Sequence, residues 1–298
     1  MLAKSQKEAT VYQFRAIRSL SVQIENDPEP MVQQQLARLK FFERQLGSKG
    51  LRILEFGCGS GFNCHWLKEV GGAREVAGFD ILPDAVALSK RSFPGIDFCV
   101  ADGCDPKLEI EPGTWDRVVC FEVLEHVPEI ATLLSNIHRH LAPDGIAFVS
   151  TPNRPVFSLD HQPSPINREH LQEYSIDELR PLLSAWFHSS EIYGQRFKNK
   201  TLLEEWHADV GQKIERVEAG TRWERKMCLS EELRKIRLVE RAYQNPLVRG
   251  GWKWFRWELI AGVKSCIAAT WRPYSFRDFE FVSDDLSDCL WLCAVLHR

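Results

Sequence analysis

The residues most able to bind a ligand form a run of alternating glycines directly after a short apolar segment. Residues 51–54 are Leu-Arg-Ile-Leu, and Glu55-Phe56-Gly57-Cys58-Gly59-Ser60-Gly61 follows them. Glycines after a strand let the backbone approach a ligand because no Cβ atom stands in the way. A dinucleotide site would need a third glycine where Phe62 stands. An acid at Glu55 suits an ammonium group better than a phosphate, so the loop predicts a different ligand.

Three other acidic residues end predicted strands and could line the same site. Asp80 follows the glycine loop by about 20 residues, the spacing at which a carboxylate reaches paired ribose hydroxyls. Asp102, before Gly103, could accept a hydrogen bond from an adenine amino group, and Glu122 ends the fourth strand. Each acid alone is equally well explained as a helix cap or a turn residue. Together with the glycine loop, and in this order, these strand ends predict a nucleoside site.

A second set of residues could remove a proton or hold a metal. Glu122, Glu125 and His126 are spaced i, i+3, i+4, so on a helical turn they would lie on one side. His170 follows later, in segment 165–170. Two carboxylates and two imidazoles can hold a divalent cation that acidifies a hydroxyl. Two other interpretations stay open: His126 or His170 acts as a general base beside Glu125, or His126 is only packed.

Alternating strand and helix patterns from residue 51 onward place these residues at the ends of strands. Such alternation is typical of a parallel sheet with crossover helices, whose ligands bind at the carboxyl ends of the strands. We therefore expect an α/β fold with a Rossmann-like doubly wound sheet of seven strands, the last antiparallel. The predicted strands are 52–56, 75–80, 97–101, 115–120, 146–150, 190–194 and 289–296, and the predicted helices among them are 62–70, 83–92, 129–140 and 174–187.

The chain divides into four predicted parts. Residues 1–48 form N-terminal helices, 49–195 the sheet core, 196–285 a mostly helical insertion and 286–298 the last core strand. In the insertion, segment 249–257 interleaves aromatic with basic residues, which suits a sugar ring, a stacked base or a lipid interface. The alternative is a cap whose tryptophans form its own core. We expect the insertion and the N-terminal helices to form the acceptor pocket. The tryptophans of the insertion are Trp206, Trp223, Trp252, Trp254, Trp257 and Trp271.

The composition is that of a globular protein without a strong charge preference for its partners. The 298 residues carry a net charge of −3, which gives no general attraction to nucleic acid or to anionic lipid. The nine cysteines include no C-x-x-C pair, as expected of reduced thiols. No run of about 18 apolar residues would span a bilayer, and residues 1–10 lack the apolar core of a signal peptide. These features predict a cytoplasmic protein.

The motifs together resemble those of the class I S-adenosylmethionine-dependent methyltransferases. The glycine loop matches the first motif, E-x-G-x-G-x-G, and segment 121–127 matches the motif after the fourth strand. The turn 141–145 matches the one before the fifth strand. The resemblance implies S-adenosylmethionine as cofactor, with the loop facing the methionine moiety, Asp80 the ribose and Asp102 the adenine. The cofactor contacts that it implies are Glu55, Gly57, Cys58, Gly59, Gly61, Asp80, Ile81, Asp102, Gly103 and Glu122.

A looser resemblance concerns the methyl acceptor. Segments 150–154, 167–170 and 173–175 resemble bacterial methyltransferases of surface glycans and specialised metabolites, which implies a hydroxyl of a sugar or small molecule. The E-x-x-E-H segment is similar in ubiquinone-biosynthesis O-methyltransferases and in small-RNA 3′-terminal 2′-O-methyltransferases, which permits a divalent metal. An RNA 2′-O-methyltransferase is one alternative, against which the acidic balance stands, and a small-molecule N-methyltransferase is another. The sequence leaves peripheral membrane contact and oligomeric state open.

Overall fold

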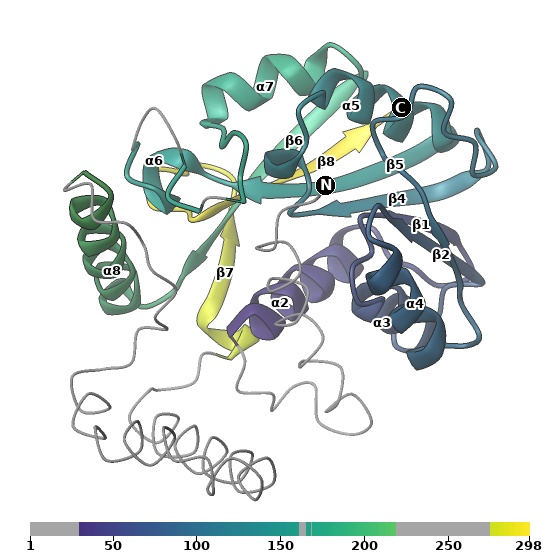
Figure 1. The fold of residues 1–298 in the computed structure, drawn as a ribbon, viewed down its shortest axis with the longest axis horizontal. Coiled ribbons are helices and arrows are strands. Elements are labelled where there is room, and N and C mark those ends of the chain that lie inside the picture. The colour runs from purple at the N-terminus through teal and green to yellow at the C-terminus, as the bar shows by residue number, and fades with distance from the viewer. Residues whose placement is uncertain (1–29, 161–164, 168, 219–274) are drawn as a thin grey trace, which may run out of the picture. The chain divides into compact units, whose positions relative to one another are not determined.

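The strands form one mixed sheet in a computed structural model that describes residues 30–160, 165–167, 169–218 and 275–298. The strands are β1 (Arg52–Phe56), β2 (Glu75–Asp80), β3 (Asp97–Val100), β4 (Trp115–Phe121), β5 (Leu141–Pro152), β6 (Ser189–Phe197), β7 (Phe279–Val282) and β8 (Trp291–His297). Their order in the eight-stranded sheet is β3-β2-β1-β4-β5-β8-β6-β7 (Figure 1). Met1–Ile214 and Ser275–Arg298 belong to one compact unit, which holds the whole sheet, and Glu215–Tyr274 form a second.

The strand order reverses at β1, and such a reversal is where ligands bind in doubly wound folds. β1 pairs in parallel with β2 on one side and with β4 on the other, so that Ile53 lies opposite both Val76 and Arg117. β8 instead runs antiparallel between β5 and β6. The predicted doubly wound sheet with an antiparallel last strand is confirmed.

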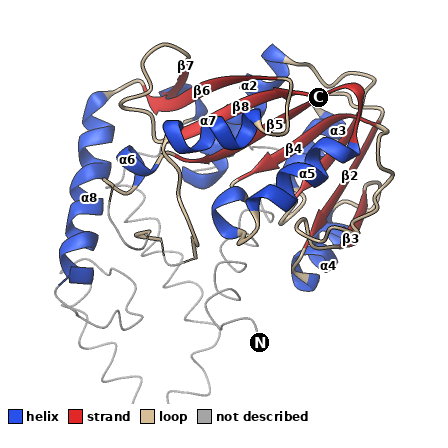
Figure 2. Cartoon of the chain, turned by 90° about the horizontal axis from the view of Figure 1, so that it is seen from above, coloured by secondary structure: helices blue, strands red, loops and turns tan. Residues whose placement is uncertain are grey.

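Helices cover both faces of the sheet, as a parallel sheet requires. They are α2 (Pro30–Gln45), α3 (Phe62–Glu69), α4 (Pro83–Ser92), α5 (Ile130–His140), α6 (Arg154–Phe157), α7 (Ile176–Ser184) and α8 (Lys200–Glu218), with the 3₁₀ turns η3 (Leu124–His126) and η4 (Phe276–Asp278). Adjacent residues of β4 face opposite ways: Val118 packs in a buried cluster with Leu133, and Val119 packs in another with Phe42. α5 and α7 therefore lie on one face, seen in front of the strands in Figure 2, and α2, α3 and α4 lie on the other.

β7 makes one strand more than the seven predicted. It lies in segment 196–285, which the sequence predicts to be mostly helical, and it pairs antiparallel with β6 at the edge of the sheet. Phe279 stacks on Phe197 and Phe281 on Phe41 of α2, with 4.9 and 4.1 Å between ring centroids. Four residues are too few for a strand periodicity to be recognised. These tertiary contacts, and not a local pattern, therefore fix β7.

Several predictions concern residues outside the described part of the chain. The N-terminal segment is described only from α2 onward, and among the insertion's tryptophans only Trp206 belongs to the described residues. The acceptor pocket and the four-part division therefore stay predictions. Among the described helices, none has the length and apolar character needed to cross a membrane. The remaining tryptophans, which lie outside the described residues, are Trp223, Trp252, Trp254, Trp257 and Trp271.

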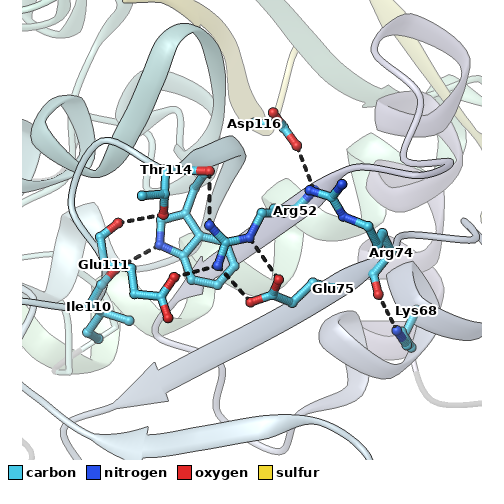
Figure 3. A network of polar contacts seen from close by, with 9 residues as sticks. Arg52, Lys68, Arg74, Glu75, Ile110, Glu111, Thr114 and Asp116 are labelled. Atoms are coloured by element: carbon cyan, nitrogen blue, oxygen red, sulfur yellow. Dashed lines mark hydrogen bonds and ion pairs between the residues drawn. The ribbon is translucent and has the colours of Figure 1, made fainter.

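A charged network fixes the amino ends of the central strands, away from the glycine loop (Figure 3). The guanidinium of Arg52 donates to both carboxylate oxygens of Glu75 at 2.8 Å, which joins the first residues of β1 and β2. The Arg52 backbone N–H donates to the Asp116 carboxylate at 2.8 Å, which joins β1 to β4. The same guanidinium lies 4.6 Å from the ring centroid of Trp115 and pairs with Glu111. The register of these three strands is thus fixed at the end opposite the candidate site.

Candidate active site

The glycine loop joins β1 to α3 in a conformation that only glycine adopts without strain. Gly57, Gly59 and Gly61 have φ angles of +70°, +51° and +77°. A Cβ on Gly57 would lie 2.5 Å from Cγ2 of Val123, and one on Gly61 would lie 2.8 Å from Cζ of Phe98. The loop therefore touches the segment that follows β4, and a side chain at either glycine would push these elements apart.

The residues predicted to face a nucleoside come together at the ends of β2 and β3. The Asp80 carboxylate accepts hydrogen bonds from the backbone N–H groups of Gly59 and Leu82, each at 2.9 Å. Burial raises the pKa of Asp80, which these backbone donors partly oppose. Ile81 is 53% exposed beside it. Asp102 is also exposed and accepts from the backbone N–H of Cys104 at 2.8 Å, so its other oxygen is available to a ligand.

Glu55 turns its carboxyl group toward the start of α3. One oxygen accepts from the Asn63 amide at 2.7 Å, and the other accepts from the Cys64 thiol at 2.9 Å. The side chain is buried, and burial raises the pKa of Glu55 to about 7. Cys58 is buried as well, and its backbone N–H donates to the Phe79 carbonyl at 2.8 Å. Burial also raises the pKa of the Cys58 thiol, which argues for packing and against reactivity.

Glu122 is separated from the other two members of the E-x-x-E-H segment by its backbone. Its φ of +54° lies in the left-handed region, where a side chain costs about 1 kcal/mol. Its carboxylate accepts from the Ser150 hydroxyl at 2.8 Å and lies 3.4 Å from the guanidinium of Arg38. The three residues therefore do not share one helical turn as predicted, because η3 begins only at Leu124, although the Glu122 charge still acts on both Glu125 and His126.

Arg38 on α2 is a site residue that the sequence analysis missed. Its side chain is 1% exposed and donates to the Gln195 side chain of β6 at 2.7 Å. Its guanidinium also lies 5.2 Å from the ring centroid of Trp291 on β8. Nothing in the helical pattern of residues 30–45 distinguishes a buried arginine from a solvated one, because the partners lie on strands far away in the sequence.

Glu125, His126 and His170 converge into one cluster. They offer ligand atoms that all lie within 4.8 Å of one another. His126 Nε2 lies 3.9 Å from Glu125 Oε1, and the two imidazole rings are 4.9 Å apart between centroids. Glu125 is fully buried, and its Oε2 accepts from the Thr151 hydroxyl at 3.0 Å, whereas none of the described residues forms a hydrogen bond with Oε1. The predicted grouping of these three residues therefore holds in the structure, and Glu122 lies outside it.

Polar groups outside the cluster hold both imidazoles in place. His126 Nδ1 lies 2.9 Å from the Glu169 carbonyl, and because a carbonyl only accepts, Nδ1 carries the proton and Nε2 has the free lone pair. His170 Nδ1 lies 2.6 Å from the buried Glu173 carboxylate, and its Nε2 lies 2.8 Å from the Asn167 amide. Neither Glu173 nor Asn167 was predicted to have a role, although each lies three residues from His170, a spacing that could have indicated both.

The protonation states of the cluster follow from burial. Burial lowers the pKa of His126, and the Glu169 carbonyl only partly opposes that effect. Burial and then the Glu122 charge raise the pKa of Glu125 well above its ordinary value. Both shifts favour the neutral forms, and His126, whose ordinary pKa already lies below 7, is therefore mostly neutral near neutral pH. The His126 side chain is 38% exposed, so a neutral imidazole with a free lone pair is accessible to an incoming molecule.

Comparison with known proteins identifies the family. The family model described as a methyltransferase domain matches residues 31–210. A probable S-adenosylmethionine-dependent methyltransferase of Mycolicibacterium smegmatis is 35% identical over 146 residues, which are 49% of this chain and 55% of that protein. A ubiquinone biosynthesis O-methyltransferase of Xanthomonas euvesicatoria is 32% identical over 121 residues, 39% of this chain and 49% of that protein. The chain thus spans about half the length of the curated relatives that it matches.

Solved structures are similar to this chain at low identity. An S-adenosylmethionine-dependent methyltransferase from Mesorhizobium loti has a TM-score of 0.46 at 20% identity, over 60% of this chain and 92% of that one. Phosphoethanolamine N-methyltransferase 2 of Haemonchus contortus has a TM-score of 0.47 at 15% identity, over 88% and 52% of the two chains. The family model covers more than half of the chain. The chain therefore belongs to the methyltransferase-domain family, within the class I S-adenosylmethionine-dependent superfamily.

Proposed function

We propose that the protein transfers a methyl group from S-adenosylmethionine to a hydroxyl group of a small molecule or sugar. The observation that supports this most is the placement of a free imidazole lone pair directly after β4, in the segment that touches the glycine loop. A hydroxyl must lose its proton as it attacks a sulfonium methyl group, and a neutral histidine suits that role. The new O–C bond forms as the C–S bond breaks, with its electron pair passing to sulfur.

His126 is the proposed general base in this reaction. Its Nε2 would take the hydroxyl proton, since Nδ1 is held by the Glu169 carbonyl. His170 supports the imidazole by an edge contact, with ring planes at 82° to each other. Glu125 is the fully buried member of the cluster. On the cofactor side, the proposed contacts are the loop glycines for the methionine moiety, Asp80 for the ribose and Asp102 for the adenine.

A divalent cation is a second candidate for activating the hydroxyl. The side chains present fit one: the unpartnered Glu125 Oε1 and His126 Nε2 are both available, and His170 could join them if the exposed Asn167 released its Nε2. The Glu173 carboxylate would then orient His170, as carboxylates commonly do for metal-bound histidines. A cation bound there would lower the pKa of a coordinated hydroxyl.

Binding of S-adenosylhomocysteine tests the cofactor assignment before any acceptor is known. We expect calorimetry to give a Kd below about 1 mM, the upper range for enzyme ligands. Absence of heat and of any thermal shift at that concentration would contradict the proposed function. Transfer of label from S-adenosylmethionine to a panel of sugars, phenols and amines then tests the acceptor class. Methylation of amines alone would replace the hydroxyl assignment.

Substitution of His126, combined with a chelator, distinguishes a histidine base from a metal ion as the group that activates the hydroxyl. We expect His126→Asn to lower kcat by about 10²- to 10⁴-fold, because the base is lost, while the Kd for S-adenosylhomocysteine stays unchanged. His138→Asn on α5 is the matched control and should retain activity. A chelator should have no effect if His126 is the base. Loss of activity with chelator, restored by Mg²⁺ or Mn²⁺, would assign the cluster to a metal instead.

A further inference from the structure

A cavity lies between α2, α3, η4 and β7. Its volume is about 540 Å³, which is within the range of small-molecule sites. Its apolar lining includes Trp66 of α3 and Phe279 and Phe281 of β7. Trp66 and Val70, at the carboxyl end of α3, are among the lining residues, whereas the glycine loop precedes the amino end of the same helix. The cavity is therefore distinct from the cofactor loop.

The charges that line this cavity are mostly positive. Lys40, Arg44, Lys198 and Arg277 contribute four cations, against one carboxylate, Glu43. The Glu43 carboxylate is already engaged, because it accepts from the backbone N–H of Ser48 at 3.3 Å and from the Ser48 hydroxyl. The whole chain has a net charge of −3. The cavity is thus positively charged although the protein as a whole is negatively charged. A positive cavity favours an anionic ligand.

Two of these cations lie near one aromatic ring. The Lys40 Nζ lies 4.5 Å from the ring centroid of Phe276, and the Arg277 guanidinium carbon lies 5.2 Å from it. Lys198 Nζ donates to the Arg277 carbonyl at 2.7 Å, which brings a third cation to the same turn. Within the described part of the chain, no carboxylate pairs with Arg44, Lys198 or Arg277. An anion placed among them would relieve their mutual repulsion.

We propose that this cavity binds an organic anion with a flat apolar body, such as an aromatic carboxylate, phosphate or sulfonate. The apolar body would lie against Trp66 and the phenylalanines of β7, and the anionic group would lie between Arg44 and Arg277 at the rim. Aromatic side chains with flanking cations provide both stacking and charge for such a ligand. This inference is independent of the proposed methyl transfer, because none of the lining residues belongs to the cofactor loop or to the Glu125 cluster.

Titration of the full chain with 8-anilinonaphthalene-1-sulfonate tests the site, with the uncharged N-phenyl-1-naphthylamine as the matched probe. We expect one molar equivalent of the sulfonate to bind at least about tenfold more tightly than the neutral compound. Raising the ionic strength should weaken binding of the sulfonate but not of the neutral compound, because salt screens exposed charges. Arg44→Ala and Arg277→Ala should each weaken sulfonate binding about fivefold, near the upper value for an exposed ion pair. Arg91→Ala on α4 is the control and should change nothing.

Two outcomes would overturn this proposal. The first is equal binding of the charged and neutral probes, or binding that Arg44→Ala and Arg277→Ala do not affect. The second is arginine-dependent sedimentation with phosphatidylglycerol vesicles without binding of the sulfonate, which would replace the small ligand by a lipid surface. Both arginines are exposed, so the variants are expected to fold, and unchanged melting temperatures and S-adenosylhomocysteine affinity would verify this. A failure here is thus distinguishable from a failure of the cofactor assignment.

Discussion

Glu55 is a buried acid that contacts polar groups but, among the described residues, no cation. Its carboxyl group contacts Asn63 and Cys64, and burial raises its pKa to about 7. An ammonium group nearby would favour the ionised form and lower that pKa. The ligand-free protein therefore holds Glu55 about half protonated at neutral pH, and the proposed cofactor, whose methionine moiety carries an ammonium group, would complete the site.

This gives a pH prediction for cofactor binding. Because ionised Glu55 is the form that attracts an ammonium group, we expect the affinity for S-adenosylhomocysteine to rise with pH through about 7 and then level off. Glu55→Gln should bind more weakly and with little pH dependence over the same interval. Calorimetry from about pH 5.5 to 8 measures both proteins, and parallel pH profiles for the two would refute the role of Glu55.

Glu55 also makes the stability of the ligand-free protein depend on pH. The folded-state pKa of Glu55 is raised, so its contribution to stability is complete below about pH 4.5 and is lost as the pH rises through about 7. Glu55→Gln cannot ionise. Between about pH 5 and pH 8, the melting temperature of the wild type should therefore fall relative to that of Glu55→Gln. A constant difference between the two would show that Glu55 does not titrate in this interval.

At the residue scale, motif spacing predicted which side chains meet but not how they point. Asp80 and Asp102 lie together because neighbouring parallel strands end at one edge of a sheet. The spacing of Glu122, Glu125 and His126 predicted a single turn, yet η3 begins only at Leu124 and Glu122 has a positive φ. The Glu122 carboxylate contacts Ser150 and Arg38, which are distant in the sequence, so no local pattern could have predicted where it points.

At the scale of elements, Arg38 connects α2 to three strands or strand ends of the sheet. It pairs with Glu122 after β4, with Gln195 of β6 and with Trp291 of β8. α2 lies within the predicted N-terminal helices, whereas its function as an anchor for Glu122 was not predicted. β7 shows the same limit, because its phenylalanines acquire a strand conformation only from pairing with β6.

The Arg38–Glu122 pair can be tested by a double-mutant cycle. Removing one partner of a buried pair costs about 3–5 kcal/mol, because the other charge is left uncompensated. We expect Glu122→Gln to cost less than this, because Glu122 is 26% exposed, but more than about 1 kcal/mol, because it leaves the 1% exposed guanidinium of Arg38 without its carboxylate. Arg38→Met combined with Glu122→Gln should cost less than the sum of the two single changes. Urea unfolding measures all three variants, and strict additivity would contradict the coupling.

A matched control for this cycle lies at the edge of the sheet. Arg196 pairs with Glu280 and Asp288, each at 2.8 Å, and its side chain is 25% exposed. Partly exposed pairs of this kind contribute about 0–1 kcal/mol. Arg196→Met should therefore reduce the free energy of unfolding much less than the changes at Arg38 and Glu122. An equal loss would show that burial is not the cause of the larger effect.

At the scale of the whole molecule, the cofactor site and the proposed acceptor pocket come from different parts of the chain. The glycine loop, Asp80 and the Glu125 cluster all belong to the first compact unit. The tryptophan-rich segment was predicted to form the acceptor pocket together with the N-terminal helices, and most of that segment belongs to Glu215–Tyr274. This division suggests that donor binding and acceptor binding can be separated by deletion.

We expect a protein in which residues 219–274 are replaced by a short Gly-Ser linker to bind S-adenosylhomocysteine with unchanged affinity. It should lose methyl transfer to the acceptor, because the proposed pocket is removed. Keeping α8 and β7 preserves the edge of the sheet, where a longer deletion would expose β6. Thermal unfolding serves as the control for folding. Methylation that survives in the folded deletion protein would remove the insertion from the acceptor site.

The position of β8 has a consequence for how the chain acquires its structure during synthesis. β8 lies between β5 and β6 but follows them by many residues, with the insertion in between. Until β8 is made, β5 and β6 each present an unpaired edge with exposed apolar side chains, the kind of surface on which nascent chains aggregate. Pairings between strands so distant in sequence also form slowly. We therefore expect the unpaired edges of β5 and β6 to be the part of the nascent sheet that needs chaperones. We also expect misassembly by strand exchange between copies to occur there.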